Sequence, residues 1–209
     1  LYKTHNMKEF IKVNKYYLIT IFLMLLTFIL VKKHFSYELL TLDTSIHDKL
    51  LTIFHTDFLN YIMRTISFVG SVYFYIPLLI LVLIKSKKYF KLISIPLIIT
   101  YLTNMIFKLT INRNRPLTWI VTPPHDPSFP SGHTVCSVVF YGIIVYLLKN
   151  IKNKNLRLFL RILLTILIIL IGLSRLYLGV HFLSDVLAAY LLGLLVLIMF
   201  IKYYKTKNI

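Results

Sequence analysis

The sequence predicts an all-α, polytopic membrane protein, a bundle of six transmembrane helices with a short interfacial helix after the first span. Hydrophobic residues make up 58% of the chain, against about 45–50% in a soluble domain, and the mean hydropathy is +0.77. The apolar residues gather in runs between basic segments, and no run alternates strictly as a membrane-barrel strand would. Because no long linker or internal repeat divides the chain, we expect a single integral membrane domain over residues 1–209.

Six apolar runs are the candidate spans, and each needs about 20 helical residues to cross a hydrocarbon core of ~30 Å. The runs are residues 16–31, 66–84, 92–107, 134–148, 158–173 and 182–201. Several are short, but interfacial residues and snorkelling lysines extend a short helix. Lys32, Lys33 and His34 follow the first run in place of small residues suited to cleavage, so we expect an uncleaved first span.

The segment between the first two runs, residues 34–65, carries apolar residues at near-helical spacing with charges between them. This pattern predicts a short amphipathic helix that lies along the membrane interface. Its acids, Asp43, Asp48 and Asp57, have no tight ligand spacing. We therefore interpret them as part of a solvated helix face and expect no metal there.

The distribution of Lys and Arg predicts the orientation in the membrane. Of the 24 Lys and Arg residues, 16 fall in segments 1–15, 85–91, 149–161 and the tail from Lys202. Basic segments stay in the cytoplasm, so both termini are expected there. The net charge of +17 then reflects topology, and we expect no nucleic-acid partner. The single cysteine, Cys136, excludes an intramolecular disulfide.

Three polar clusters interrupt the apolar runs, and the predicted orientation places all of them on the outer face of the membrane. Such a gathering of three cations, two histidines and one carboxylate suits a phosphorylated lipid. The clusters are Lys108 with Arg115-Pro116, then Pro130-Ser131-Gly132-His133, then Ser174-Arg175 with His181 and Asp185.

The third cluster can supply a nucleophile. If His181 and Asp185 lie on the entering turn of the last span, their i, i+4 spacing puts them on one face. Asp185 would then accept a hydrogen bond from Nδ1–H of His181, as in the serine-protease triad, and leave Nε2 as a basic nucleophile. On these two residues alone, a structural His–Asp pair at a helix start is as good an interpretation. The spacing also suits a metal, although no second ligand pair accompanies it.

The second cluster has the features of a helix N-terminus. Pro130 and Ser131 are residues that commonly begin a helix, and Gly132 has no side chain to block the approach of an anion. Backbone N–H groups there would point at an anion placed before the helix. His133 would lie beside that anion, where an imidazole can donate a proton at neutral pH. Taken alone, this turn is more simply a helix cap.

The first cluster supplies positive charge. Lys108 closes the third run as a compact point charge, and Arg115 adds a planar fork that matches phosphate oxygens. Either residue alone is more often an interfacial anchor. We interpret the neighbouring Arg113 as such an anchor.

Taken together, the clusters resemble the type-2 phosphatidic acid phosphatase family, also called the lipid phosphate phosphatases. The shared pattern is lysine, six residues, Arg-Pro; then Pro-Ser-Gly-His; then Ser-Arg, five residues, His, three residues, Asp. The pattern covers Lys108 to Asp185, and the six-span layout extends the resemblance over the whole chain. Soluble haloperoxidases share the motifs, so the membrane assignment depends on the apolar runs. The compact chain is most similar to small bacterial phosphatidylglycerophosphatase B-like members.

The resemblance implies a role for each matching residue. His181 attacks phosphorus and becomes a phosphohistidine, Asp185 orients it, and His133 protonates the leaving group and then activates water. Family members need no metal or cofactor, in line with the lack of the clustered acids that a two-metal site requires. The phosphate oxygens are held by Lys108, Arg115, Arg175, Ser131 and the backbone of Gly132.

The resemblance also implies a lipid phosphomonoester or diphosphate as substrate, reached from the bilayer. Only residues 117–129 join the first two clusters, too few for a lid domain, and Trp119 and Ile120 could dip into the headgroups. We expect phosphatidylglycerol phosphate first, with phosphatidic acid or undecaprenyl diphosphate as alternatives. Gly132 argues against the last, because some of that group have Asp at this position. The lipid and the bilayer are the expected partners, with no obligate protein partner.

Two other functions would use the same residues. A lipid phosphotransferase would form the same phosphohistidine but pass the phosphate to a second lipid. A transporter would use the cations only to recognise phosphate, yet transporters place ionisable groups near the bilayer midplane. These runs carry only small hydroxyls and, near the outer end, Asn104. The motifs therefore favour phosphoryl chemistry, and both hydrolysis and transfer fit them.

Overall fold

The computed structural model describes residues 11–15, 18–19, 21–22, 25–26, 37–53 and 56–207, and these ranges contain helices and no strand. The all-α prediction is confirmed for this part of the chain. The elements are α2 (Tyr37–Ile53), α3 (Asp57–Val69), α4 (Val72–Lys85), α5 (Lys87–Ile111), α6 (Gly132–Leu147), the 3-10 turn η1 (Leu148–Asn150), α7 (Lys154–Tyr177) and α8 (Leu183–Thr206).

Four of these helices are long and apolar enough to cross a membrane, namely α5, α6 with η1, α7 and α8. A fifth span is formed if α3 and α4 are taken together, although they are bent by 46° at their junction. The predicted runs from 66–84 onward therefore fall on these elements. The first run, 16–31, lies mostly outside the described residues, so the sixth span stays a prediction.

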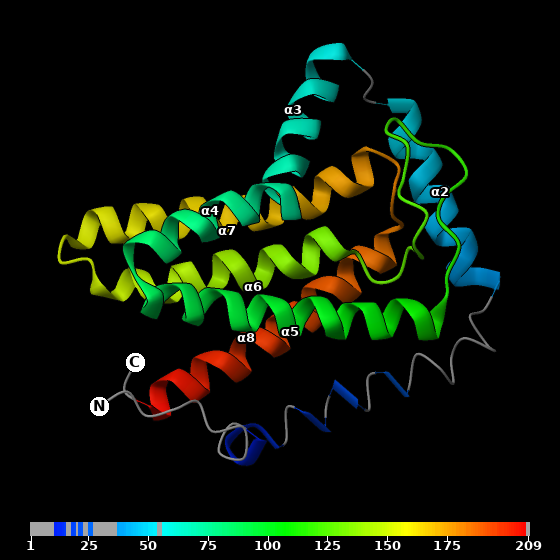
Figure 1. Cartoon of the computed structure of the whole chain (residues 1–209). Coiled ribbons are helices and arrows are strands. Elements are labelled where there is room, and N and C mark those ends of the chain that lie inside the picture. Colours follow the sequence, from blue (N-terminus) through cyan, green and yellow to red (C-terminus); the bar gives the residue numbers. More distant parts are fainter. Residues whose placement is uncertain are drawn as a thin grey trace.

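Helix α6 is the centre of the bundle, where it packs against α5, α7 and α8 (Figure 1). Its residues Val135, Val139 and Ile143 are fully buried, because a helix that is apolar on all sides can face neighbours all round. Helix α7 is different, since only 11% of the residues in its most apolar stretch are buried. We therefore take its outer face to be in contact with lipid.

The junction of α3 and α4 depends on close packing at Gly70. A Cβ atom at this position would lie 2.5 Å from Cγ2 of Ile171, so a larger residue would push α3 away from α7. The hydroxyl of Tyr141 donates a 2.7 Å hydrogen bond to the carbonyl of Val69 and so pairs a backbone group at the break. Figure 1 shows α3 rising steeply from the plane of α4 and α7.

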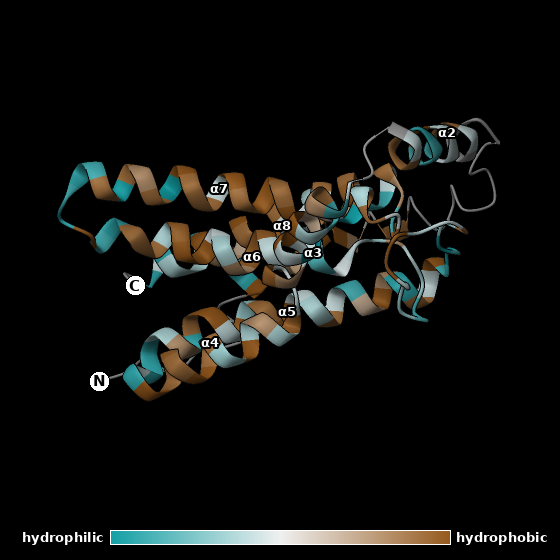
Figure 2. Ribbon diagram, turned by 90° about the horizontal axis from the view of Figure 1, so that it is seen from above, coloured by the Kyte–Doolittle hydropathy of each residue, from teal (hydrophilic) through white to brown (hydrophobic). Residues whose placement is uncertain are grey.

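The polar ends of the helices meet at one end of the bundle. Helices α5 and α7 finish there and α6 and α8 begin there, so the connections 112–131 and 178–182 lie together, with α2 beside them (Figure 1). Figure 2 shows apolar residues along the helices and hydrophilic residues toward their ends. A helix is present at Tyr37–Ile53, inside the segment 34–65 where one was predicted, whereas residues 57–65 belong to α3. The place of α2 at the membrane interface stays a prediction.

Candidate active site

The structure brings the three polar clusters together at this end of the bundle. Nη1 of Arg115 lies 3.2 Å from Nε2 of His181, although 66 positions separate them. The backbone N–H of Ser131 donates to the carbonyl of Asp185 at 3.2 Å, and so links the start of α6 to the start of α8. The positive charges of Arg175 and Lys108 also act on His181. Residues from all three motifs therefore line one site.

Lys108 and Arg115 are both bound by Asp126, a residue that the sequence analysis did not single out. Nζ of Lys108 lies 2.9 Å from one carboxylate oxygen of Asp126, and Nη2 of Arg115 lies 2.8 Å from the other. Lys108 also donates to the carbonyl of Pro127, and Nε of Arg115 donates to the carbonyl of Asp126 at 2.8 Å. An anion already occupies the donors that were predicted to hold phosphate.

The charges around Asp126 set its ionisation. Its partial burial alone would raise the pKa of the carboxyl, but hydrogen bonds and charges from Lys108 and Arg115 outweigh this and lower the pKa below its usual value. Its side chain is 40% exposed, so water reaches the carboxylate. Asp126 is therefore an ionised and accessible anion at neutral pH.

His181 lies in the connection before α8 and not on its first turn, because the helix begins at Leu183. Nδ1 faces Asp185 at 3.5 Å, which is longer than a good hydrogen bond, and Nδ1 has no hydrogen-bond partner in the described part of the chain. The expected hydrogen bond is therefore a looser contact. A guanidinium can only donate, so Nε2 must accept from Arg115 and the proton lies on Nδ1, toward Asp185.

The surroundings of His181 keep its imidazole neutral. Burial is the main cause, and the charges of Arg115, Arg175 and Lys108 add to it, so the pKa of His181 lies well below its usual range. Only 2% of the residue is exposed. A neutral imidazole with its lone pair on Nε2 has the protonation state that a nucleophile requires.

Asp185 is fully buried and belongs to the first turn of α8. Its Oδ2 accepts a 2.9 Å hydrogen bond from the backbone N–H of Phe182, which caps the helix start. Its Oδ1 accepts a 2.7 Å hydrogen bond from Nη1 of Arg113. Because both oxygens are held, the carboxylate has a fixed orientation toward His181.

The interpretation of Arg113 as an interfacial anchor is wrong. Its guanidinium donates to the hydroxyl of Ser184 at 2.6 Å, to Asp185 at 2.7 Å and to Asp43 at 2.7 Å. It also lies 4.4 Å from the ring centroid of Phe182. Arg113 is thus the link between the start of α8 and helix α2.

The interpretation of Asp43 as part of a solvated helix face is also wrong, whereas Asp48 and Asp57 are exposed as expected. Asp43 is only 3% exposed, and its carboxylate accepts from the backbone N–H of Ser184 at 3.1 Å. One turn further along α2, Nε2 of His47 lies 3.0 Å from Oγ1 of Thr118. The buried face of α2 therefore contacts both the 112–131 connection and the start of α8.

The second cluster is placed as predicted, since α6 begins at Gly132. The hydroxyl of Ser131 accepts from Thr134 at 3.0 Å. Electrostatic interactions join His133, in the first turn of α6, to Arg175, His181 and Arg115.

Arg175 occupies the last turn of α7 and is 7% exposed. It donates a hydrogen bond to the hydroxyl of Ser67 near the end of α3, another residue that the sequence analysis missed. Its Nε is buried without a hydrogen-bond partner in the described part of the chain. A donor of this kind, next to His181, suits an anion.

The connection 178–182 contains one position that requires glycine. Gly179 has φ of +73°, and a Cβ there would lie 2.9 Å from the carbonyl oxygen of Thr118. The backbone N–H of Ile120 donates to the carbonyl of Leu178 at 3.0 Å. Gly179 thus lets the two site connections pack together and holds His181 beside Arg115.

Several of the missed residues had a signal in the sequence. Asp126 is the one acid in the connection between the first two motifs, and it follows the cations Lys108 and Arg115 of the first motif, for which it is the nearest acidic partner along the chain. Asp43 and His47 have the i, i+4 spacing of neighbours on a helix face. Across the residues that the structure describes, no group of three or more His, Cys, Asp or Glu side chains is placed to hold a metal.

Comparisons with known proteins agree with the motifs. A family model described as the PAP2 superfamily matches residues 88–209. The chain is 32% identical over 157 residues to phosphatidylglycerophosphatase B of Bacillus subtilis, a match that covers 70% of this chain and 76% of the relative. It is 33% identical over 143 residues to an undecaprenyl-diphosphatase of Sulfolobus acidocaldarius, which covers 65% of this chain and 66% of the relative.

Two crystal structures have a similar fold. The transmembrane PAP2-type phosphatidylglycerolphosphate phosphatase from Bacillus subtilis has a TM-score of 0.78 at 27% identity and covers 90% of this chain and 96% of its own. Aquifex aeolicus LpxE has a TM-score of 0.63 at 26% identity, with 78% and 96% covered. The predicted resemblance is thus confirmed: by motif, sequence and fold, this chain belongs to the PAP2 superfamily.

Proposed function

We propose that this membrane-embedded PAP2 phosphatase hydrolyses a lipid phosphomonoester or diphosphate through a phosphohistidine on His181, without a metal ion. The observation that carries the proposal is the orientation of this imidazole. Nε2 lies 3.2 Å from Arg115, and Nδ1 faces Asp185 at 3.5 Å. A buried, neutral and oriented nitrogen beside a guanidinium suits attack on a phosphorus atom that the guanidinium holds.

The reaction has two steps. In the first, the Nε2 lone pair of His181 forms a bond to phosphorus while the phosphorus–oxygen bond to the lipid breaks, and His133 gives a proton to the leaving oxygen. In the second, His133 takes a proton from water, whose oxygen attacks phosphorus and breaks the bond to nitrogen. Asp185 stabilises the positive charge that develops on the imidazole in each step.

The surrounding cations stabilise the charge on the phosphoryl oxygens. Phosphoryl transfer depends mainly on positioning and electrostatics, and removing one such donor typically costs about 10²–10³ in rate. The carboxylate of Asp126, which now binds Lys108 and Arg115, must give way to the phosphate. The proposed phosphate ligands are Lys108, Arg115, Arg175, Ser131 and the backbone N–H of Gly132.

We propose phosphatidylglycerol phosphate as the preferred substrate. Both the curated relative and the crystal structure from Bacillus subtilis carry names of phosphatases for this lipid, and the fold match covers 90% of the chain. Phosphatidic acid is an alternative with the same phosphomonoester chemistry. Undecaprenyl diphosphate is the second candidate, because an undecaprenyl-diphosphatase matches at similar identity.

We further propose that one membrane domain of six spans places this site on the outer face. The basic residues of η1, of the first half of α7 and of the end of α8, among them Lys149, Arg161 and Lys205, lie at the opposite end of the bundle, and they would face the cytoplasm with both termini. Helix α2 would lie along the outer interface. A lipid tail could then stay in the bilayer while its phosphate enters the site.

The test is release of phosphate from three lipids by the full chain and by a His181→Ala variant. Wild-type protein should release inorganic phosphate, fastest from phosphatidylglycerol phosphate, and the variant should release none. With ³²P-labelled substrate, acid quenching should lose the label from protein and alkaline quenching should keep it, as expected for phosphohistidine. Label that passes to a second lipid would show a phosphotransferase, and full activity of His181→Ala would overturn the mechanism.

A further inference from the structure

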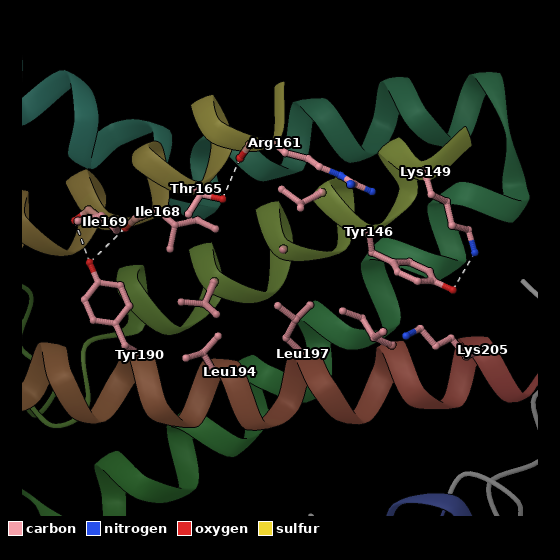
Figure 3. Close-up of a pocket in the computed structure, with 14 residues that line it drawn as sticks. Tyr146, Lys149, Arg161, Thr165, Ile168, Ile169, Tyr190, Leu194, Leu197 and Lys205 are labelled. Atoms are coloured by element: carbon pink, nitrogen blue, oxygen red, sulfur yellow. Dashed lines mark hydrogen bonds between the residues drawn. The ribbon is translucent and has the colours of Figure 1, made fainter. Parts of the chain in front are cut away.

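A pocket extends from the middle of the bundle to the end opposite the candidate active site. Its volume is about 720 Å³ and it is formed between α6, α7 and α8. Ligand pockets commonly measure about 300–1,000 Å³. Figure 3 shows the lining side chains, with Tyr190 at one end and Lys149 and Lys205 at the other. We call it the cationic pocket.

The walls of the cationic pocket are apolar along most of its length. Leu194 and Leu197 of α8 face Ile168 and Ile169 of α7 across it (Figure 3). The hydroxyl of Tyr190 donates to the carbonyl of Ile169 at 2.8 Å and closes the inner end. Two of the lining residues on α7, Thr165 and Ile169, are exposed, so the pocket is accessible along this helix. An occupant must therefore present hydrocarbon to these walls.

Positive charge is concentrated at the end of the cationic pocket that lies farther from the candidate active site. Lys149, Arg161 and Lys205 line this end, and no Asp or Glu occurs among the described lining residues. Nε of Arg161 is buried and has no hydrogen-bond partner in the part of the chain that the structure describes. Lys149 contacts Tyr146, whose hydroxyl accepts from Nζ at 2.8 Å. A buried donor in a pocket that two further cations line suits an anionic partner.

The length of the cationic pocket matches one leaflet of a bilayer. Tyr190 and Lys205 are 15 residues apart on α8, which at 1.5 Å per residue gives about 22 Å. Half of a hydrocarbon core measures about 15 Å, and the remaining length reaches the headgroup level. An acyl chain beside Leu194 would thus bring a phosphate to Arg161 and Lys205.

We propose that the cationic pocket binds one anionic phospholipid from the leaflet at this end of the bundle. The acyl chain lies between α7 and α8, and the headgroup phosphate contacts Arg161 and Lys205. The site is separate from the phosphate site near His181, so the inference does not depend on the proposed reaction. A bound lipid of this kind fills the gap between the helices that carry the catalytic motifs and stabilises their packing.

The test is native mass spectrometry of the full chain in detergent, titrated with dioleoyl phosphatidylglycerol or with dioleoyl phosphatidylcholine. An Arg161→Gln, Lys205→Gln double variant removes the charges, and Thr165→Trp, at an exposed lining position, fills the pocket and keeps them. The matched control is Lys152→Gln with Lys154→Gln, which removes two exposed cations from the same end of the bundle. All variants keep the candidate active site, so lipid bound there contributes equally.

Wild type should bind phosphatidylglycerol more tightly than phosphatidylcholine, and the charge variant should lose roughly ten- to thirtyfold in affinity, from about 1 kcal/mol per cation. Thr165→Trp should show a comparable loss, and the control should bind like wild type. An equal loss in the control would assign the effect to general surface charge and overturn the proposal, as would unchanged binding by Thr165→Trp.

Two further outcomes would also overturn it. Inorganic phosphate should not displace the lipid at the pocket, because it has no acyl chain, and full displacement would indicate a site for phosphate alone. A dimer that both pocket variants convert to monomers, with lipid binding unchanged, would make a second copy of the chain the occupant. Unfolding temperatures measured without lipid check that each variant is folded.

Discussion

Arg113 holds Asp185 from the side opposite to His181, through a 2.7 Å hydrogen bond from Nη1 to Oδ1. The same guanidinium binds Asp43 on α2 at 2.7 Å through Nη2. A residue outside the three motifs thus fixes the carboxylate that faces the proposed nucleophile. Arg113 also brings Asp43 of α2 to the start of α8, where Asp43 contacts Ser184, 141 positions away in the sequence.

We expect Arg113→Ala to lower kcat strongly while KM changes little, because Arg113 orients Asp185 and does not bind the phosphate. Removing one partner of a buried ion pair typically costs about 3–5 kcal/mol, so the unfolding temperature should also fall. Phosphate release and thermal unfolding in detergent measure the two effects.

Two variants separate positioning from general destabilisation by Arg113→Ala. Arg113→Lys keeps one charge and should recover part of the stability but little of kcat, since lysine cannot bind both carboxylates as a fork does. Arg64→Gln removes an exposed arginine that contacts the carbonyl of Ile120, and it should behave like wild type. A rise in KM with unchanged kcat in Arg113→Ala would contradict the positioning role.

The motif residues could be predicted from the sequence because each motif is local. Short spacings place Ser131 before His133 and His181 before Asp185, whatever the path of the chain between the motifs. The partner of Asp43 could not be assigned, because its i, i+4 spacing with His47 indicates a shared helix face but not whether that face meets water or a distant arginine. The burial of Asp43 depends on Arg113, 70 positions away.

The apolar run 66–84 predicts one span, but the structure divides it between α3 and α4 at Gly70. The local signal is the pair Gly70-Ser71, which provides the C-cap of α3 and the N-cap of α4, and Gly/Ser pairs are common at sharp kinks. The bend itself also depends on distant residues, since Gly70 packs against Ile171 of α7 and Tyr141 of α6 binds the carbonyl of Val69. These two contacts could not be predicted from the local sequence.

We expect Asp185→Asn to lower the rate by about 10²–10⁴ while lipid binding stays nearly intact. An amide removes the negative charge that stabilises a positive His181, and a comparable change in the serine-protease triad costs about 10⁴. The rate at which labelled phosphoenzyme forms in the burst measures the first step. Substrate binding to the inactive His181→Ala protein gives the reference affinity. A fall in binding that accounts for the whole effect would contradict the role of Asp185.

The low pKa of His181 leads to an expectation about pH. An ordinary histidine with a pKa of about 6.5 is roughly three-quarters neutral at about pH 7 and one-quarter neutral at about pH 6. Because burial and the neighbouring cations lower the pKa of His181, its neutral fraction stays nearly complete over this range.

The rate of phosphoenzyme formation in a single turnover should therefore not fall between about pH 7 and about pH 6, and protonation of His133, which donates to the leaving oxygen in this step, should only raise it. Repeating the profile with His125→Gln removes an exposed histidine in the 117–129 connection as a source of titration. A roughly threefold fall toward pH 6, with an apparent pKa near the usual histidine value, would show that His181 titrates normally.

Metal removal should leave the reaction unchanged. In the proposed mechanism the charge that a metal would supply comes from Lys108, Arg115 and Arg175, and two-metal hydrolysis needs clustered acids as ligands. Dialysis against EDTA should leave kcat and KM as they were, and added Mg²⁺ or Zn²⁺ should have no effect. Loss of activity in EDTA that a divalent ion restores would remove the metal-free mechanism.

The carboxylate of Asp126 binds both Lys108 and Arg115. A phosphate that uses these cations must displace it, and the side chain is accessible enough to move, with 40% exposed. Partly exposed ion pairs are worth about 0.2–1 kcal/mol each, so the loss of two pairs in Asp126→Asn should tighten inhibition by phosphate or vanadate about two- to thirtyfold. KM for the lipid should fall in parallel.

The effect of Asp126→Asn should be the same from about pH 5 to about pH 8, because the lowered pKa of Asp126 keeps it ionised throughout this range. Asp48→Asn, which removes an exposed acid from α2, controls for the change in net charge and should leave phosphate inhibition unaltered. Weaker inhibition in Asp126→Asn would mean that the carboxylate holds Lys108 and Arg115 in their binding positions. In that case Asp126 would organise the phosphate site, and the competition between carboxylate and phosphate would not limit binding.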